Sequence, residues 1–289
     1  MNITVLSVCT NNSPLLENFK KSLEINGYPY EILGVGEKWG GWNWRTRKYI
    51  EKMKNMDLND VAILTDSTDV IFVQPKNVFI DKFTKMNARA VIGAETHCCT
   101  GKFSRGEMKL FATFTATNLT KSIYRYPNGG FICGYVKDLL EILDNNKDEP
   151  DDQAAYLEMH LNRTNLFVLD SNNIFVGNWI NATNSDFVFN HPKEDFKYWK
   201  ISSDGKYYNT LSNEAPVAFH FAGKNPKYYN IVGEHYFGKN FNKMREENVR
   251  EEFSRMARKQ FTVITNPFNF TRIMLAIIVI ILVLLYFKK

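Results

Sequence analysis

Short apolar runs alternate with amphipathic stretches along most of the chain. Ile3–Val8 and Tyr30–Val35 have the pattern of core strands, and Leu15–Ile25 between them has helical spacing. A strand, a helix and a second strand in this order predict a right-handed crossover and a parallel strand pair. Arg45–Met56 has the pattern of another helix. The pattern therefore predicts an α/β fold with a parallel sheet.

Two carboxylates follow a buried strand in the stretch Val61–Phe72. Asp66 and Asp69 stand three residues apart directly after four apolar or β-branched residues and a threonine. A strand that runs into a turn brings such residues together, so both side chains can converge on one hard divalent cation. The alternative is a turn in which Asp66 and Ser67 cap backbone amides and Asp69 faces water. The spacing alone leaves both interpretations open.

An aromatic loop, residues 36–44, follows the second predicted strand. It holds three tryptophans and three glycines in nine residues. The rings form either a wall on which a base stacks or a hydrophobic plug over the edge of the sheet. Composition favours the plug, because structural aromatic residues are the commoner kind. In open parallel sheets ligands bind beyond the carboxyl ends of the strands, so this loop and the loop at Thr10 should flank one site.

Other polar residues follow or precede predicted elements further along. Asn128 lies in a glycine turn before an apolar strand, and Asp151, Asp152 and Gln153 precede a helix at 154–161. Helix capping explains one of these aspartates. His220 follows the apolar strand Ala215–Phe219, where a structural histidine is commoner than a ligand. The segment 97–99, His-Cys-Cys, lacks the second ligand pair of a zinc site.

The composition indicates a globular protein with something appended. Its 289 residues are 44% hydrophobic, enough for one large core, and the net charge of +5 includes no basic block typical of nucleic-acid binding. The four cysteines lack paired spacing, so reduced thiols are expected. Near the end, the uncharged apolar run Ile273–Phe287 lies between Arg272 and two lysines. With snorkelling flanks it approaches the roughly 20 residues of a membrane-spanning helix.

These features predict three segments. They are a catalytic or binding domain at 1–240, a charged juxtamembrane helix or linker at 241–267 and a transmembrane anchor at 268–289. The first core strand begins at Ile3, which leaves no room for a signal peptide. We therefore expect a single-pass membrane protein anchored at its carboxyl end, in a compartment and orientation that the sequence leaves open.

The order of the motifs carries a resemblance. The segments 34–41 (Gly-Val-Gly-Glu-Lys-Trp-Gly-Gly), 65–71 (Thr-Asp-Ser-Thr-Asp-Val-Ile), 128–132 (Asn-Gly-Gly-Phe-Ile) and 151–153 (Asp-Asp-Gln) occur in that succession. In this order they resemble the GT-A glycosyltransferase domain of the procollagen lysyl hydroxylases, from about Ile3 to Gly238. The resemblance implies the α/β GT-A fold, with a Rossmann-like, mixed and mostly parallel sheet flanked by helices. Stand-alone domains of this kind occur in large DNA viruses, and the many Asn, Lys and Ile residues suggest an A+T-rich genome.

The resemblance implies roles for particular residues. It assigns Mn²⁺ binding to Asp66, Asp69 and His220, with the ion bridging the diphosphate of a UDP-sugar. It implies nucleotide contacts for Thr10, Trp44, Thr68, Gly223, Lys224 and Lys227, and it places Asn128, Asp151, Asp152 and Gln153 around the donor sugar. Asp152 would attack the sugar or stabilise its oxocarbenium-like centre, as in retaining enzymes. Cys99 stands where the family has a tryptophan, so the gate over the sugar would differ.

The resemblance also suggests a reaction. It implies a retaining transferase that moves glucose from UDP-glucose to galactosyl-hydroxylysine of a collagen-like protein. A hydroxylysine galactosyltransferase using UDP-galactose, or another UDP-hexose transferase, is the alternative within this class. From another class, a membrane-tethered module could bind a sugar or collagen without turnover. Paired carboxylates that repel one another without a metal argue for the enzyme.

Overall fold

The computed structural model describes residues 1–245 apart from 99, 101, 103–105, 180–194 and 223–224. The chain divides into two compact units, Met1–Met244 and Arg245–Lys289. Within the described part of the chain, no helix combines the length and the apolar character that crossing a membrane requires. The anchor expected at 268–289 lies outside the described residues, as does most of the charged segment expected at 241–267.

A six-stranded sheet, in the order β2-β1-β3-β6-β5-β7, forms the centre of the first unit. Its strands are β1 (Ile3–Val8), β2 (Tyr30–Leu33), β3 (Val61–Thr65), β5 (Ala90–Glu95), β6 (Tyr126–Tyr135) and β7 (Val168–Asp170). The pairs β1–β2, β1–β3 and β5–β7 are parallel, whereas β6 runs antiparallel to both neighbours. The predicted mixed, mostly parallel sheet is confirmed. Because β6 is reversed, its first residues lie at the edge where the other strands end.

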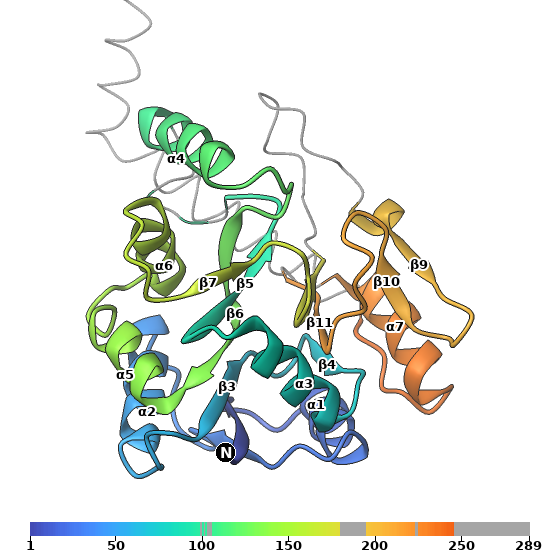
Figure 1. Ribbon diagram of the computed structural model, residues 1–289. Coiled ribbons are helices and arrows are strands. Elements are labelled where there is room, and N and C mark those ends of the chain that lie inside the picture. Colours follow the sequence, from blue (N-terminus) through green and yellow to red (C-terminus); the bar gives the residue numbers. More distant parts are fainter. Residues whose placement is uncertain (99, 101, 103–105, 180–194, 223–224, 246–289) are drawn as a thin grey trace, which may run out of the picture. The chain divides into compact units, whose positions relative to one another are not determined.

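Helices cover both faces of this sheet (Figure 1). They are α1 (Pro14–Ile25), α2 (Trp42–Met53), α3 (Lys76–Met86), α5 (Val136–Asp144) and α6 (Asp152–Leu161). Successive strand residues point to opposite faces. Val5 therefore packs in one cluster with Phe19 of α1 and Phe79 of α3, whereas Leu6 packs in another with Met53 of α2. Burial on both faces explains why these strands are continuously apolar.

Two helices begin earlier than the apolar pattern predicts. α2 begins at Trp42 instead of Arg45, after Gly41 with φ of 97°, a left-handed conformation that favours glycine. α6 begins at Asp152 instead of Ala154, because the Asp151 side chain caps it. Both shifts add polar or aromatic residues to the first turn of a helix. Among them, Trp44 packs with Leu33, the last residue of β2.

A smaller sheet and a hairpin complete the unit. The small sheet, in the order β4-β11-β8, contains β4 (Val70–Phe72), β8 (Val176–Asn178) and β11 (Ala218–His220). The remaining elements are α4 (Gly106–Leu119), the 3₁₀ helix η1 (Asp195–Tyr198), β9 (Trp199–Ile201), β10 (Tyr207–Asn209) and α7 (Pro226–Phe237). Buried aromatic residues, among them Trp179, Trp199, Phe219 and Tyr229, join β11 to the hairpin and α7. This packing fixes the strand that carries His220.

Candidate active site

Three potential metal ligands meet where the large sheet adjoins the small one. Asp66 follows β3, Asp69 precedes β4, and His220 ends β11, where it pairs with Val70 of β4. One ligand atom from each residue lies within 4.8 Å of the others. Nε2 of His220 is 3.6 Å from Oδ2 of Asp66 and 3.7 Å from Oδ2 of Asp69. Ligand atoms about 2 Å from a shared cation lie about 3–4 Å apart, so this spacing fits one ion.

The orientation of His220 is set on its other side. Nδ1 lies 2.9 Å from Oδ1 of Asn178, whose Nδ2 donates to the carbonyl of Ala94 at 2.8 Å. A neutral His220 therefore donates from Nδ1 and turns the lone pair of Nε2 toward the carboxylates. Gly130 of β6 makes room for the ring, because a Cβ at that position would lie 2.2 Å from Cε1 of His220. The donor set is two carboxylates and one imidazole, which suits a borderline-hard divalent cation.

The electrostatics of the triad also favour a cation. Burial lowers the pKa of His220, but the charges of Asp69 and Asp66 outweigh this effect and raise that pKa overall. Burial also raises the pKa of Asp66; the positive charge of Arg45 opposes this, and the negative charge of Asp69 adds to it. His220 and Asp66 therefore hold protons more strongly than they do in water. A divalent cation would replace those protons as the compensating charge.

Arg45 links the triad to the start of α6. Its Nη1 donates to Oδ1 of Asp66, and its Nη2 donates to Oδ2 of Asp152 at 2.5 Å and to the carbonyl of Gly129 at 3.4 Å. Arg45 is 5% exposed and Asp152 is also 5% exposed. The ring of Trp42 lies over the guanidinium, 4.6 Å from Cζ to the ring centroid. A buried guanidinium thus holds one carboxylate of the triad and one carboxylate of α6.

Glu95 organises the other side of this cluster. It is 1% exposed at the end of β5 and accepts hydrogen bonds from Nδ2 of Asn128 at 2.6 Å and from Nε2 of Gln153 at 2.7 Å. The amide oxygens of these two residues accept the backbone N–H groups of Gly130 and Gly129, respectively. Glu95 therefore orients both amides and ties the first residues of β6 to α6. The turn predicted at Asn128 is wrong: this segment is part of strand β6, whose pairing with β5 shifts register between Ile92 and Gly93. Asn128, Asp152 and Gln153, which the resemblance placed around a sugar, lie in one network in which Asn128 and Asp152 are buried and Gln153 is half-buried.

Asp151 has a structural contact within α6. Its side chain accepts the backbone N–H of Ala154 at 3.1 Å, the interaction of an N-cap residue. Sequence reasoning allowed capping for one aspartate of the pair, and Asp151 is that residue. Asp152, one position later, turns to Arg45. The two adjacent carboxylates therefore have different surroundings.

The residues expected around uridine begin from one edge of the sheet. Thr10 follows β1 and Thr68 follows β3, while Trp44 lies in the first turn of α2 and packs with Leu33 of β2. β2, β1 and β3 are neighbouring parallel strands, so the segments that follow them start side by side. A Cβ at Gly40 would lie 2.6 Å from Trp44. The roles of Thr10, Trp44 and Thr68 stay predictions.

The plug interpretation of the aromatic loop describes Trp44 alone. Trp44 is half-buried against the core, whereas Trp39 and Trp42 are 42% and 44% exposed. Their rings meet edge to face, with centroids 5.1 Å apart. Composition alone does not distinguish a tryptophan that packs against the core from one that is exposed, because it gives no information on which ring packs where.

The predicted phosphate contacts are only partly described. Lys227 is exposed in the first turn of α7, and its Nζ lies 5.0 Å from the ring centroid of Tyr228. The first turn of a helix presents backbone N–H groups that favour an anion. Gly223 and Lys224 lie outside the described residues, as does Cys99. Cys9 and Cys133 are buried free thiols.

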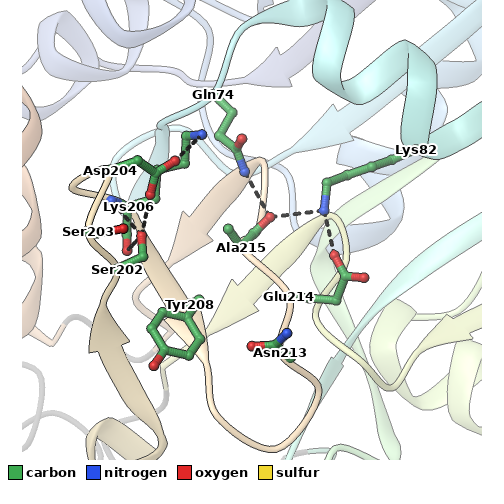
Figure 2. A pocket seen from close by; sticks show the side chains of 10 residues that line it. All are labelled: Gln74, Lys82, Ser202, Ser203, Asp204, Lys206, Tyr208, Asn213, Glu214 and Ala215. Carbon is green, nitrogen blue, oxygen red and sulfur yellow. Dashed lines mark hydrogen bonds and ion pairs between the residues drawn. The ribbon is translucent and has the colours of Figure 1, made fainter.

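A separate recess of about 500 Å³ lies at the opposite end of β11 from His220 (Figure 2). Figure 2 shows Lys82 reaching Glu214, and Lys206 lying beside Asp204. The Nζ–O distances of these ion pairs are 2.8 and 2.6 Å. The pairs balance the charge of this recess internally, unlike the triad, where two carboxylates face one imidazole.

The family of the chain follows from a comparison with known proteins. A family profile described as the PLOD GT domain matches residues 1–247. The chain belongs to this family. This PLOD-type domain is therefore a glycosyltransferase, and its mixed α/β sheet flanked by helices is consistent with the expected GT-A arrangement.

Curated relatives support the assignment over part of their length. A multifunctional procollagen lysine hydroxylase and glycosyltransferase of Caenorhabditis elegans is 26% identical over 263 residues, 83% of this chain and 33% of the relative. Procollagen-lysine,2-oxoglutarate 5-dioxygenase 1 of Gallus gallus is also 26% identical, over 81% of this chain and 32% of the relative. The chain thus spans about a third of the length of each of these relatives.

A solved structure gives a weaker match. It is a crystal structure of a glycosyltransferase involved in the glycosylation of the major capsid of PBCV-1. It aligns with a TM-score of 0.45 at 14% identity, covering 81% of this chain and 100% of that one.

Two residues of the site were missed by sequence reasoning. The sequence predicted Arg45 only as the first residue of a helix, and it gave no role to Glu95. Glu95 carries a signal that Asp66 also carries, an acidic residue at the end of a buried strand. Arg45 carries no such signal, since its partners are 21 and 107 residues away.

Proposed function

We propose that this PLOD-type domain is a Mn²⁺-dependent, retaining UDP-sugar transferase that adds glucose to galactosyl-hydroxylysine of a collagen-like protein. The observation that carries the proposal is the triad of Asp66, Asp69 and His220, joined through Arg45 to Asp152. The name of the Caenorhabditis elegans relative supports the acceptor class, because it describes a procollagen lysine hydroxylase and glycosyltransferase.

The triad would hold Mn²⁺ through Oδ2 of each aspartate and Nε2 of His220. When bound, the ion would neutralise charge on the diphosphate as UDP departs. Asn178 keeps the imidazole turned toward the carboxylates. Lys227 and the first turn of α7 would bring positive charge to the phosphates. The chain itself thus supplies a negative pocket for the cation and positive groups for the phosphates.

The donor sugar would lie beside the network that Glu95 organises. Asn128 and Gln153 would position its hydroxyl groups through the hydrogen-bonding groups of their amides that Glu95 and the backbone do not use. Asp152 would face the reacting carbon as a stabilising carboxylate. Its buried ion pair with Arg45 supports this role over attack on the sugar, because a charge-paired carboxylate is a weak nucleophile. Exclusion of water around these buried groups would limit hydrolysis of the donor.

A donor and acceptor panel tests the proposal. The full chain is incubated with UDP-glucose, UDP-galactose or UDP-N-acetylglucosamine, with and without Mn²⁺, and with bare or galactosylated hydroxylysine peptides, and UDP release is measured. We expect Mn²⁺-dependent release that is highest with UDP-glucose and the galactosylated peptide. Preference for UDP-galactose and the bare peptide would favour the galactosyltransferase.

Asp69→Ala gives the matched variant for this panel. It removes one expected ligand without removing a packed apolar side chain, and we expect it to abolish both turnover and Mn²⁺-dependent UDP binding. Circular dichroism confirms that the variant is folded. Equal release with and without Mn²⁺ by the wild-type protein would contradict the metal-dependent mechanism.

We also propose the membrane anchor at 268–289, on the apolar run and its basic flanks alone. If the full chain sediments with membranes and needs detergent for extraction, and if deletion of residues 268–289 releases it, the anchor is supported. A wild-type protein that stays in the supernatant when membranes are sedimented would contradict it.

A further inference from the structure

Two carboxylates with separate tasks in the proposed reaction share one guanidinium. Asp66 belongs to the metal triad at the end of β3, and Asp152 belongs to the sugar side at the start of α6. Arg45 of α2 donates to both through different nitrogens, Nη1 and Nη2. The planar guanidinium has fixed angles between its N–H groups, so a shift of either carboxylate is passed on to the other.

The surroundings leave Arg45 little freedom. Its side chain is 6% exposed, the ring of Trp42 covers it, and Nη2 also reaches the carbonyl of Gly129. Nε of Arg45 is buried and has no hydrogen-bond partner among the described residues. The ion pairs with Asp66 and Asp152 therefore hold the guanidinium of Arg45 in place. Removing one partner of such a buried pair leaves an uncompensated charge.

The ion pair also decides which oxygens face the metal. Oδ1 of Asp66 is taken by Arg45, and Oδ2 lies 3.6 Å from Nε2 of His220. Asp66 is thereby set to bind a cation through one oxygen only. In the same way, Oδ2 of Asp152 is taken, which leaves Oδ1 for a ligand. One side chain thus selects the reactive oxygen at both places.

We propose that Arg45 is a positioning residue that couples the metal centre to the sugar side of the site. The proposal rests on the proposed function, since it assigns a positioning residue to that same site. Arg45 holds Asp66 and Asp152 in one fixed relation, so that a change on the sugar side alters metal binding and the reverse. Arg45 itself touches neither the metal nor the reacting carbon.

Arg45→Lys tests the fork separately from the charge. Lysine keeps the positive charge but lacks the planar fork that reaches two carboxylates. We expect Mn²⁺-dependent UDP affinity, measured by calorimetry, to fall about tenfold, as for outer-shell partners of metal ligands. We expect kcat for UDP release to fall about 100-fold, the cost of misplacement by about 1 Å.

Arg89→Lys is the matched control. Arg89 also contacts two carboxylates, Asp138 and Glu141, but it precedes β5 at the end opposite Glu95. We expect this variant to change the melting temperature without changing UDP affinity or kcat. A loss of affinity that tracks the melting temperature in both variants would assign Arg45 a purely structural role and contradict the proposal.

Asp152→Glu provides a second test that does not alter Arg45. It keeps the charge but lengthens the side chain by one methylene, which displaces the guanidinium. We expect Mn²⁺-dependent affinity for UDP, which carries no sugar, to fall at least threefold, although position 152 lies outside the triad. Unchanged affinity in this variant and in Arg45→Lys, with a wild-type protein that binds UDP and Mn²⁺, overturns the coupling alone. Absence of Mn²⁺-dependent UDP binding in the wild-type protein overturns both the proposed function and the coupling.

Discussion

Gly130→Ala is the sharpest test of the triad, because the three atoms nearest to the added Cβ all belong to the ring of His220. A Cβ at Gly130 would lie 2.2 Å from Cε1, 2.6 Å from Nδ1 and 2.8 Å from Nε2 of His220. Real Cβ contacts rarely fall below about 3.4 Å, so the ring must move by about 1 Å. Asn178 and the end of β11 hold the ring from the other side. The displacement therefore falls on the distance between Nε2 and the carboxylates.

That displacement is large compared with what a metal site tolerates. Ligand distances hold within about 0.2 Å, so a shift of about 1 Å removes His220 from the coordination shell. We expect Mn²⁺-dependent UDP affinity to fall about 100-fold, at the upper end for losses around metal ligands. Overpacking should also lower the free energy of unfolding by about 1–3 kcal/mol. Calorimetry with UDP and Mn²⁺, together with thermal unfolding, measures both effects.

The neighbouring glycine supplies the control. A Cβ at Gly129 would meet Nη2 of Arg45 at 3.5 Å and Oδ1 of Asp152 at 3.6 Å, which are ordinary contacts. Gly129→Ala should therefore keep the Mn²⁺-dependent UDP affinity within about twofold. Wild-type affinity in a folded Gly130→Ala protein would refute the assignment of His220 as a ligand.

Further predictions concern the groups that support the triad. The pKa of His220 is raised, so its proton persists to higher pH than in a free histidine and competes with the metal. Mn²⁺-dependent UDP affinity should therefore fall as the pH is lowered through that pKa, and calorimetry in buffers of different ionisation enthalpy should detect proton release. A pH-independent affinity would contradict this. Asn178→Ala removes the acceptor for Nδ1 and should weaken the same affinity about 10- to 100-fold, with unchanged affinity as the contrary result. Glu95→Gln replaces an acceptor of two amide N–H groups with a side chain that also donates, and should lower kcat and cost about 1–3 kcal/mol of stability in urea unfolding. Wild-type kcat would show that the Glu95 network does not position the sugar.

The sequence predicted the elements better than the contacts between them. Asp66 and Asp69 were found because their strand is buried on both faces and ends abruptly in carboxylates, a local pattern. His220 was expected beside them only through the family resemblance. Its strand, β11, pairs with β4 across 150 residues of sequence, and no local pattern encodes that pairing. The predicted metal residues do meet, with nitrogen–oxygen distances of 3.6 and 3.7 Å.

Arg45 shows why the rest escaped prediction. In the sequence it is one of several cations of a predicted helix, two residues before Arg47, whose side chain is 57% exposed in its ion pair with Asp148. The structure distinguishes the two arginines, because Arg45 lies against Asp66 after β3 and Asp152 at the start of α6. The composition of the aromatic loop favoured a hydrophobic plug, but it did not predict that Trp44 is half-buried while Trp42 covers Arg45. Long-range packing decides such cases.

The location of the triad on two sheets gives it a mechanical consequence. Asp66 directly follows a strand of the six-stranded sheet, whereas Asp69 directly precedes a strand of the three-stranded sheet and His220 ends another. A cation coordinated by all three residues would cross-link the six-stranded sheet to the three-stranded one. At 100 times its dissociation constant, a ligand adds about 2.7 kcal/mol to the free energy of opening. Amide hydrogen exchange in β11 should then slow, while exchange in β2, on the outer edge of the large sheet, should keep its rate.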